Sequence, residues 1–436
     1  MMQFLFWREN RGTPPLDKSR STRNIDQQRR LLARWKFLFP RSRRYEEADL
    51  DFEDFWEPAS LLLAAIEAGY PCWEMEAESR ELIPLSGQDP RDAPVGGDGP
   101  PTILIGRLPG RDLALTIAGF ASRNAIPLSD QHPLSERSLA LTIEGLWGGI
   151  GLPVWPSIPD IRKAEGYPAS QTFRRFAGRW TRIAGIPSDE HRPGSQTSSQ
   201  TPRFDRKIMG DTSMADPPMS VAEAVLEAHQ QGLRRVFLKV NKAKYLTCPL
   251  DLPDTLTREK AQALVAHVLG YASTHLEGYA DAVLVQEWVP MRREYRFLVC
   301  DSVPVTGAGI VPEYTPLDAD PATVFSPIVR KVAHQVAQER LTDQELAGYV
   351  DLASRYALEV RAENGLRDFV LDVCTIEGRP AVVEVNPCQN MGLYATRADL
   401  WIQAVAAACE ARLAPLKKES RDQDGDAVLA GRIGPA

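Results

Sequence analysis

Short apolar runs separated by longer mixed stretches fill the second half of this chain. The apolar runs predict strands, and the mixed stretches are long enough for helices. Strands are expected at 236–240, 282–289 and 294–300, and helices at 220–231, 257–277, 341–364 and 398–411. The first of these helices has a clear start signal, because Ser220 and Glu223 have the spacing of a capping box, and Gly232 is expected to end it.

The first half of the chain predicts a smaller unit in which strands and helices alternate. A helix is expected at 59–68, a strand at 100–106, and further helices at 112–123 and 138–147. Alternation of this kind is typical of an α/β arrangement with a partly parallel sheet.

The chain is therefore expected to have five parts. These are a basic, flexible tail (1–50), an α/β domain (51–157), a linker or irregular insertion (158–204), a second domain (205–416) and a disordered tail (417–436). The linker is expected because residues 193–202 consist of Pro, Gly, Ser, Thr and Gln, which is typical of flexible connectors.

The most informative chemistry lies in two strand-like runs that flank a turn centred on Gly378. In an antiparallel hairpin, the residue numbers of every directly opposed pair add up to the same value. If the loop has three or five residues and is centred on Gly378, that value is twice 378, so Asp372 lies directly opposite Glu384. Side chains alternate between faces, so Asn386 joins them on the same face. The other face is apolar and suits a core: Leu371, Val373, Val383 and Val385. Opposed carboxylates repel unless a cation lies between them, so a hard divalent cation such as Mg²⁺ is expected there.

A strand end at residues 286–289 carries polar groups that suit a nucleotide. Gln286, Glu287, Trp288 and Val289 come just before a break at Pro290, where backbone N–H and C=O groups are expected to be unpaired. Such groups bind the edge of a planar base, and the carboxylates of Glu287 and Glu294 accept from ribose hydroxyls. The alternative is that both carboxylates are solvated strand ends.

Three cationic residues are candidates for phosphate contacts. Lys239 lies late in an apolar strand, either at the rim of a sheet or against a phosphate. Arg296 shares a strand face with Glu294 and either meets a phosphate bidentately or pairs with Glu294. Arg330 follows a loop and is a weaker candidate.

Composition narrows the class of protein. With 436 residues the chain is long enough for two to four modules, and its net charge of -7 argues against nucleic acid as the main partner. Only the arginine-rich residues 1–44 suit a nucleic-acid or membrane-surface arm. No apolar run reaches about 18 residues, so no membrane helix is expected. Six cysteines without CxxC spacing favour a reducing cytoplasm, and the six histidines lack metal-ligand spacing.

The order of these features resembles the ATP-grasp superfamily over roughly residues 205–410. That order is a strand lysine, a strand end, a glutamate, and an Asp/Glu/Asn set: Lys239, 286–289, Glu294, Asp372, Glu384 and Asn386. The preceding α/β unit looks like the pre-ATP-grasp domain that accompanies this fold. The resemblance implies an α/β and α+β protein, in which a pre-ATP-grasp unit is followed by a two-subdomain ATP-grasp fold.

The resemblance also implies a role for each residue. Lys239 and Lys207 would hold phosphates of ATP, and residues 286–289 would hold adenine. Glu287 and Glu294 would contact adenine or ribose. One or two Mg²⁺ (or Mn²⁺) ions would be bound by the set Asp372, Glu384 and Asn386. Arg296 or Arg330 would stabilise the transferring phosphoryl group.

Three segments depart from the family pattern or border its acceptor site. Many family ligases have an arginine two residues before the metal aspartate, where this chain has Val370, so Arg296, Arg330 or Arg367 would have to substitute. The flap after the strand lysine, residues 240–245, lacks glycine. The segment 386–394 resembles the loop that borders the acceptor site, where Asn390 and Tyr394 are expected to touch substrate.

The activity implied is a ligase that joins an unknown carboxylate, through an acylphosphate, to an amine or similar nucleophile. The alternatives are phosphate transfer to a non-carboxylate acceptor and a nucleotide-binding regulatory protein without turnover. A cytoplasmic protein with no membrane contact is expected, and a homodimer is the default assembly.

Overall fold

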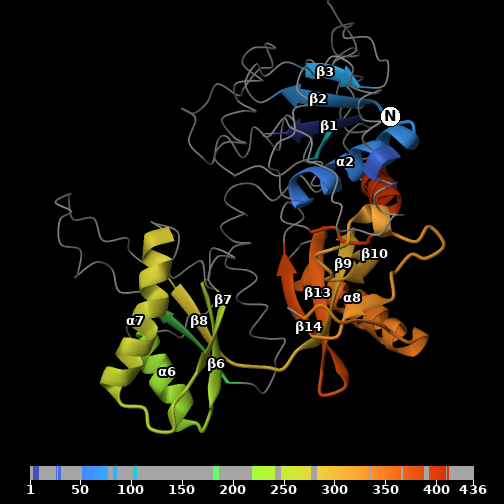
Figure 1. The fold of residues 1–436 in the computed structure, drawn as a ribbon. Coiled ribbons are helices and arrows are strands. Elements are labelled where there is room, and N and C mark those ends of the chain that lie inside the picture. Colours follow the sequence, from blue (N-terminus) through green and yellow to red (C-terminus); the bar gives the residue numbers. More distant parts are fainter. Residues whose placement is uncertain are drawn as a thin grey trace, which may run out of the picture. The chain divides into compact units, whose positions relative to one another are not determined.

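The computed structural model describes much of the chain in separate stretches. The described residues are 3–8, 26, 28–30, 52–76, 82–85, 102–105, 180–185, 219–240, 247–275, 282–332, 335–364, 367–386, 392–408 and 410–411. Figure 1 shows their helices and strands. Two predicted helices, 112–123 and 138–147, lie outside the described residues.

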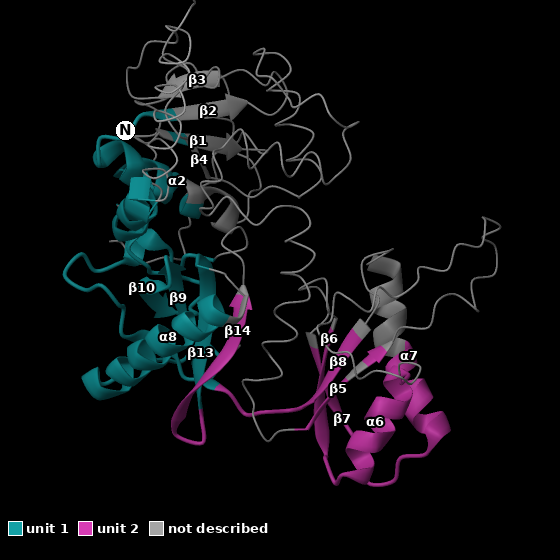
Figure 2. Cartoon of the chain, turned by 180° about the vertical axis from the view of Figure 1, so that it is seen from behind, with its two compact units in different colours: residues 1–161, 292–375, 386–436 teal, residues 162–291, 376–385 magenta. Residues whose placement is uncertain are grey.

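The chain divides into two compact units, which Figure 2 shows in different colours. Unit 1 comprises Met1–Ile161, Arg292–Thr375 and Asn386–Ala436. Unit 2 comprises Arg162–Met291 and Ile376–Val385. This division does not follow the domain borders expected from the sequence, which stay predictions.

The N-terminal part of unit 1 contains a four-stranded sheet in the order β3-β2-β1-β4 (Figure 1). Its strands are β1 (Gln3–Arg8), β2 (Cys72–Glu76), β3 (Leu82–Leu85) and β4 (Thr102–Ile105). β1 is parallel to β2 and β4, and α2 (Phe52–Glu67) lies between β1 and β2 in the sequence. Parallel neighbours need a long crossover of this kind. The partly parallel sheet is therefore confirmed.

Strand β1 lies within residues 1–50, which the sequence predicted to be a basic, flexible tail. Residues 3–8 pair with strands on both sides, and Phe4 is fully buried. The physical reason is that apolar residues precede the arginines in this segment, so the strand can enter the core before the basic stretch begins.

A second sheet, in the order β10-β9-β13-β14, contains five of the candidate site residues: Glu294, Arg296, Asp372, Glu384 and Asn386 (Figure 1). Its strands are β9 (Arg292–Cys300), β10 (Val303–Gly309), β13 (Phe369–Ile376) and β14 (Arg379–Asn386). β9 is antiparallel to both β10 and β13. Further elements of unit 1 are η3 (Pro316–Asp318), β11 (Ile328–Arg330), β12 (Gln338–Arg340) and α8 (Asp343–Asn364). β14 as far as Val385 is assigned to unit 2.

One hydrophobic core in unit 1 joins α2, the second sheet and a C-terminal helix at 398–408. Trp56 of α2, Leu298 of β9, Val370 of β13 and Trp401 of the last helix are almost completely buried in it. Both ends of the chain thus contribute to one packed unit.

Unit 2 contains a four-stranded antiparallel sheet in the order β5-β8-β6-β7 with two helices. Its elements are β5 (Thr181–Gly185), α6 (Val221–Gln230), β6 (Arg235–Val240), β7 (Thr247–Asp251), α7 (Arg258–His275) and β8 (Ala282–Glu287). The predicted capping box is confirmed, because the Ser220 hydroxyl accepts from the Glu223 N–H and the Glu223 carboxylate accepts from the Ser220 N–H. Residues 158–204 were expected to be a linker or an irregular insertion. β5 lies within this segment and pairs with β8.

The C-terminal hairpin differs from the expected one at its turn. The loop has two residues, Glu377 and Gly378, and both have positive φ angles, 51° and 78°. Two-residue loops of this type match the twist of antiparallel strands. The expected sum of residue numbers required a three- or five-residue loop, so the register inferred from it does not apply. Val382 and Val385 are buried, and Val383 is only half-buried.

No helix among the described residues is long and apolar enough to cross a membrane.

Candidate functional site

The strongest contact between predicted site residues in unit 1 joins β9 and β13. Strand pairing places Asp372 opposite Arg296. Arg296 donates from Nε to Oδ1 and from Nη2 to Oδ2 of Asp372, each at 2.8 Å. The two side chains are only 4% and 3% exposed. A buried bidentate pair fixes the orientation of both groups. Arg296 therefore pairs across the sheet with Asp372.

The loop after β14 covers the same guanidinium group. Arg296 Nη1 donates to the Gly392 carbonyl oxygen at 3.3 Å, and the guanidinium carbon lies 5.3 Å from the centre of the Tyr394 ring. A cation over an aromatic face at this distance is attracted electrostatically. Tyr394, which was expected to touch substrate, thus contacts a predicted catalytic residue.

Helix α2 supplies a carboxylate to that loop. Glu57 is buried, and its Oε1 accepts from the backbone N–H groups of Leu393, at 2.5 Å, and Tyr394, at 3.3 Å. A buried carboxylate is tolerated where such donors replace water. Glu57 is a member of the site that the sequence analysis did not identify.

In unit 2, the predicted phosphate-binding lysine contacts a predicted metal ligand. Lys239 lies near the end of β6, and its Nζ forms an ion pair with Oε2 of Glu384. Both side chains are about four-fifths buried. Lys239 is therefore not a solvated residue at the rim of the sheet.

The predicted adenine-binding segment forms the end of β8. Gln286 is buried between Thr181 of β5 and Phe237 of β6 in the sheet. The next two residues are also held, because the Glu287 N–H donates to the Trp180 carbonyl at 2.9 Å and the Trp288 N–H donates to the Arg235 carbonyl at 3.2 Å. The expectation of unpaired backbone groups is therefore wrong for these two N–H groups.

Side chains also make contacts around this strand end. The Glu287 carboxylate accepts from the Trp180 N–H at 3.3 Å. The guanidinium carbon of Arg235 lies 4.7 Å from the centre of the Trp288 ring. Val289 is buried next to them.

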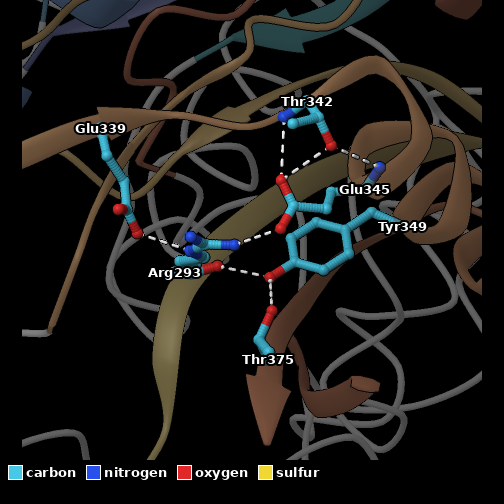
Figure 3. Close-up of polar contacts among 6 residues, drawn as sticks. All are labelled: Arg293, Glu339, Thr342, Glu345, Tyr349 and Thr375. Atoms are coloured by element: carbon cyan, nitrogen blue, oxygen red, sulfur yellow. Dashed lines mark hydrogen bonds and ion pairs between the residues drawn. The ribbon is translucent and has the colours of Figure 1, made fainter. Parts of the chain in front are cut away.

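A polar network anchors the first residues of β9, where the chain enters unit 1 (Figure 3). Arg293 has a left-handed φ of 57° and forms ion pairs with Glu339 and Glu345. The Tyr349 hydroxyl donates to the Arg293 carbonyl at 2.9 Å and bonds the Thr375 hydroxyl at 2.6 Å. A left-handed conformation costs about 1–2 kcal/mol for a residue with a Cβ atom, and these contacts offset it. The network thereby fixes the start of the strand that carries Glu294 and Arg296.

The other predicted site residues either have different contacts or lie outside the described residues. Glu294 lies on β9 near Cys374, whose pKa is raised mainly by burial and secondarily by the Glu294 charge. Arg330 pairs with Glu313, so the structure does not bring it into the Arg296–Asp372 pair. Lys207, Asn390 and the side chain of Asn386 lie outside the described residues.

The donor chemistry of this set fits a hard cation. Asp372 and Glu384 each contact a cationic side chain, which shows that both carboxylates attract positive charge. A carboxylate has about four lone-pair sites, so the two bonds from Arg296 leave acceptor capacity on Asp372. The described residues contain no cluster of three or more His, Cys, Asp or Glu suited to a metal.

Comparisons with known proteins add three similar solved structures. No family model and no curated protein matches the chain. The RimK domain ATP-grasp protein from Sphaerobacter thermophilus DSM 20745 is 15% identical, covers 82% of this chain and 97% of its own, and has a TM-score of 0.37. D-cycloserine synthetase DcsG is 15% identical, covers 80% and 93%, and has a TM-score of 0.35. The ATP-grasp ligase PsnB, complexed with minimal precursor, Mg and ADP, is 13% identical, covers 93% and 97%, and has a TM-score of 0.36.

Two of these three structures are ATP-grasp proteins. TM-scores of 0.35 to 0.37 are too low for the likeness to carry an argument about this site. The function is argued below from the residues of the chain itself.

The residues that the sequence analysis missed had weak local signals. Glu57 lies four residues before Leu61 and seven before Ala64, both buried, so it falls on the apolar face of α2. A carboxylate on that face is the signal that could have identified it. Trp180 and Arg235 had no such signal, because their roles depend on the pairing of β5, β6 and β8.

Proposed function

We propose that this chain is an ATP- and Mg²⁺-dependent ligase of the ATP-grasp type. It joins a carboxylate to an amine or a similar nucleophile and releases ADP and phosphate. Two features support the proposal: the order of the site residues along the chain, and the pairing of each proposed carboxylate ligand of the metal with a basic residue of the site.

The ion pair between Lys239 and Glu384 is the observation that carries the proposal. These residues are 145 positions apart in the sequence. The resemblance implies that Lys239 binds a phosphate of ATP and that Glu384 is a ligand of Mg²⁺. Mg²⁺ would neutralise the same phosphate charge that the lysine would contact, so a lysine and a carboxylate with these roles are expected to lie close together. Their direct contact supports these roles.

Binding of Mg²⁺-ATP would exchange the partners of this pair. The Lys239 ammonium would turn from Glu384 to a phosphate, and Glu384, Asp372 and Asn386 would hold the cation. Gln286 and the backbone at 287–289 would take the adenine, with Glu287 and Glu294 at the base or the ribose. When bound, Mg²⁺ neutralises charge on the transferring phosphoryl group.

The reaction then has two balanced steps. A carboxylate oxygen of the substrate attacks the γ-phosphorus, the bond from this phosphorus to the β–γ bridging oxygen breaks, and ADP leaves. The amine nitrogen attacks the acyl carbon, the bond from this carbon to the phosphate oxygen breaks, and the amine loses a proton. Arg296 is the proposed cation beside the transferring group because Asp372 and Tyr394 fix its orientation, and Arg330 is the weaker candidate.

Val370 is the observation that favours a second candidate, a nucleotide-binding protein without turnover. Many family ligases have an arginine at this position. Here the valine is fully buried in the core that includes Trp401. An arginine there would bring an unpaired charge into that core. Catalysis therefore depends on the arginines elsewhere, with Arg296 first.

Thermal unfolding with ATP, in the presence and absence of Mg²⁺, tests the nucleotide site. A ligand that binds only the folded state raises the midpoint. We expect wild type to gain stability from ATP and more from ATP with Mg²⁺. In Glu384→Gln the Mg²⁺ increment should be lost, whereas the shift with ATP alone should remain, because Lys239 no longer has a competing carboxylate. Glu227→Gln, which removes a carboxylate paired with Arg182 in the same unit, is the matched control and should behave as wild type.

The products separate the candidate functions once nucleotide binding is established. ADP, phosphate and an amide product indicate the ligase. ADP with a stable phosphorylated acceptor indicates a phosphotransferase, and binding without ADP release indicates the regulatory protein. If no nucleotide shifts the midpoint of wild type, the ATP site itself is refuted.

A further inference from the structure

A buried acidic residue of α2 lies outside the part of the chain that resembles the ATP-grasp fold. Glu57 is 5% exposed and lies on the helix face that carries Trp56 and Leu61 into the core. Its carboxylate Oε1 accepts two hydrogen bonds from consecutive backbone N–H groups, those of Leu393 and Tyr394. These residues are more than 330 positions away from it in the sequence. Charge-assisted bonds of this kind are stronger and more directional than neutral ones.

The segment held by Glu57 is strained and closely fitted. Tyr394 has a left-handed φ of 47°, which a residue with a side chain rarely adopts without support. A Cβ atom on Gly392 would lie 3.1 Å from the Tyr394 ring and 3.2 Å from Arg296 Nη1. In this conformation the Gly392 carbonyl and the Tyr394 ring both meet the guanidinium.

Arg296 is held from two sides by these contacts. Asp372 binds Nε and Nη2, and the Gly392 carbonyl binds Nη1. The Tyr394 ring covers the guanidinium. Movement of the 392–394 loop would therefore change the contacts that the Gly392 carbonyl and the Tyr394 ring make with this cation.

We propose that Glu57 is a positioning residue for phosphoryl transfer: it holds the loop at 392–394 in the conformation that orients Arg296 and presents Tyr394 to the acceptor. This inference rests on the proposed function for its catalytic part. Its structural part, the ordering of the loop by the Glu57 carboxylate, stands on the hydrogen bonds alone.

Two measurements on Glu57→Gln test the inference. The first is amide hydrogen exchange of the peptide that contains Leu393 and Tyr394, in full-length protein without ligand. We expect exchange there to be at least about 10-fold faster than in wild type. The second is ADP release with ATP and Mg²⁺ as the probe, in which water replaces the substrate carboxylate and accepts the γ-phosphoryl group as phosphate. We expect kcat to fall about 10-fold while the KM for ATP stays within about 2-fold, because the nucleotide-binding residues are untouched.

Three further variants keep the test decisive. Glu57→Asp retains the charge and should recover part of kcat and of the exchange protection, which a purely structural role of the longer side chain would not predict. Glu67→Gln, at the exposed end of the same helix, should match wild type in both measurements. Gly392→Ala leaves Glu57 in place but crowds Arg296, and should lower kcat in the same way.

The outcomes distinguish failure of the inference from failure of the proposed function. Unchanged exchange at Leu393 and Tyr394 in Glu57→Gln overturns the inference at its structural step. Faster exchange with unchanged kcat overturns the positioning role. If wild type neither binds ATP nor releases ADP, the proposed function fails and takes the catalytic part with it, whereas the exchange result still decides whether Glu57 orders the loop.

Discussion

Replacing Arg296 by methionine leaves the Asp372 carboxylate buried without its partner. In the folded protein this carboxylate is 3% exposed and receives two bonds of 2.8 Å from the guanidinium. Two charges about 4 Å apart interact by about 4 kcal/mol at an effective dielectric constant of about 20. Breaking a buried pair by removing one member typically costs about 3–5 kcal/mol. We therefore expect Arg296→Met to lower the free energy of unfolding of unit 1 by about 3–5 kcal/mol.

The matched control is an exposed pair of the same chemistry. Arg182 bonds Glu227 in unit 2, but the side chains are 45% and 22% exposed. Exposed pairs contribute about 0–1 kcal/mol, so Arg182→Met should cost less than about 1 kcal/mol. The difference between the two arginine variants measures the effect of burial.

Native-state hydrogen exchange in increasing urea is the suitable assay, because it reports opening of β9 and β13 separately from unit 2. A double-mutant cycle with Asp372→Asn isolates the pair, and we expect a coupling energy of about 2–3 kcal/mol. If Arg296→Met costs no more than Arg182→Met, the pair does not contribute as a buried ion pair and the reasoning is refuted.

Two further predictions concern the network at the start of β9. Tyr349→Phe removes the hydrogen bonds to the Arg293 carbonyl and the Thr375 hydroxyl. It should lower the opening free energy of β9, measured by the same hydrogen-exchange experiment, by about 1–3 kcal/mol. An unchanged opening free energy would contradict the anchoring role of Tyr349. Glu345 has a pKa below its ordinary value of 4.5, mainly because the Thr342 N–H donates to it. A lowered pKa stabilises the fold above about pH 4.5, and this contribution is lost as pH falls through the folded value. In urea unfolding, Glu345→Gln should therefore be less stable than wild type at pH 7, by about 1 kcal/mol or less because Glu345 is partly exposed. The gap should be smaller at an acid pH, after the Glu345 carboxylate has been protonated. A gap that is the same at both pH values would exclude this titration.

Tyr314→Phe is the control for the tyrosine variant. Its hydroxyl donates to the exposed Gln338 side chain at 2.7 Å, so its loss should cost about 0.5 kcal/mol or less.

Local sequence signals correctly predicted much of the fold in the second half of the chain. The capping box at Ser220 and Glu223 begins α6 one residue later, as expected. The predicted strand at 294–300 lies within β9, and the helix expected at 341–364 is α8. Caps and periodicity depend on residues within a turn or two of one another, so they can be read without knowing the tertiary structure.

The turn of the C-terminal hairpin was not predicted correctly from the local sequence. Glu377 and Gly378 form a two-residue loop with two positive φ angles. The usual signal for such a loop is Asn-Gly or Asp-Gly, because Asn and Asp tolerate this conformation. Glutamate does not give that signal, so a longer loop was expected, and the register inferred from that loop length lost its basis.

The sequence by itself determined which chemical groups the site would use, because Lys239, Arg296, Asp372 and Glu384 could be selected by type and order. Only the tertiary structure decided their partners. Arg296 meets Asp372 because β9 and β13 pair in one particular register, 76 residues apart. Glu57 reaches Leu393 because α2 and the last helix share one core. Contacts of this kind depend on strand register and packing between distant segments, and no local pattern encodes them.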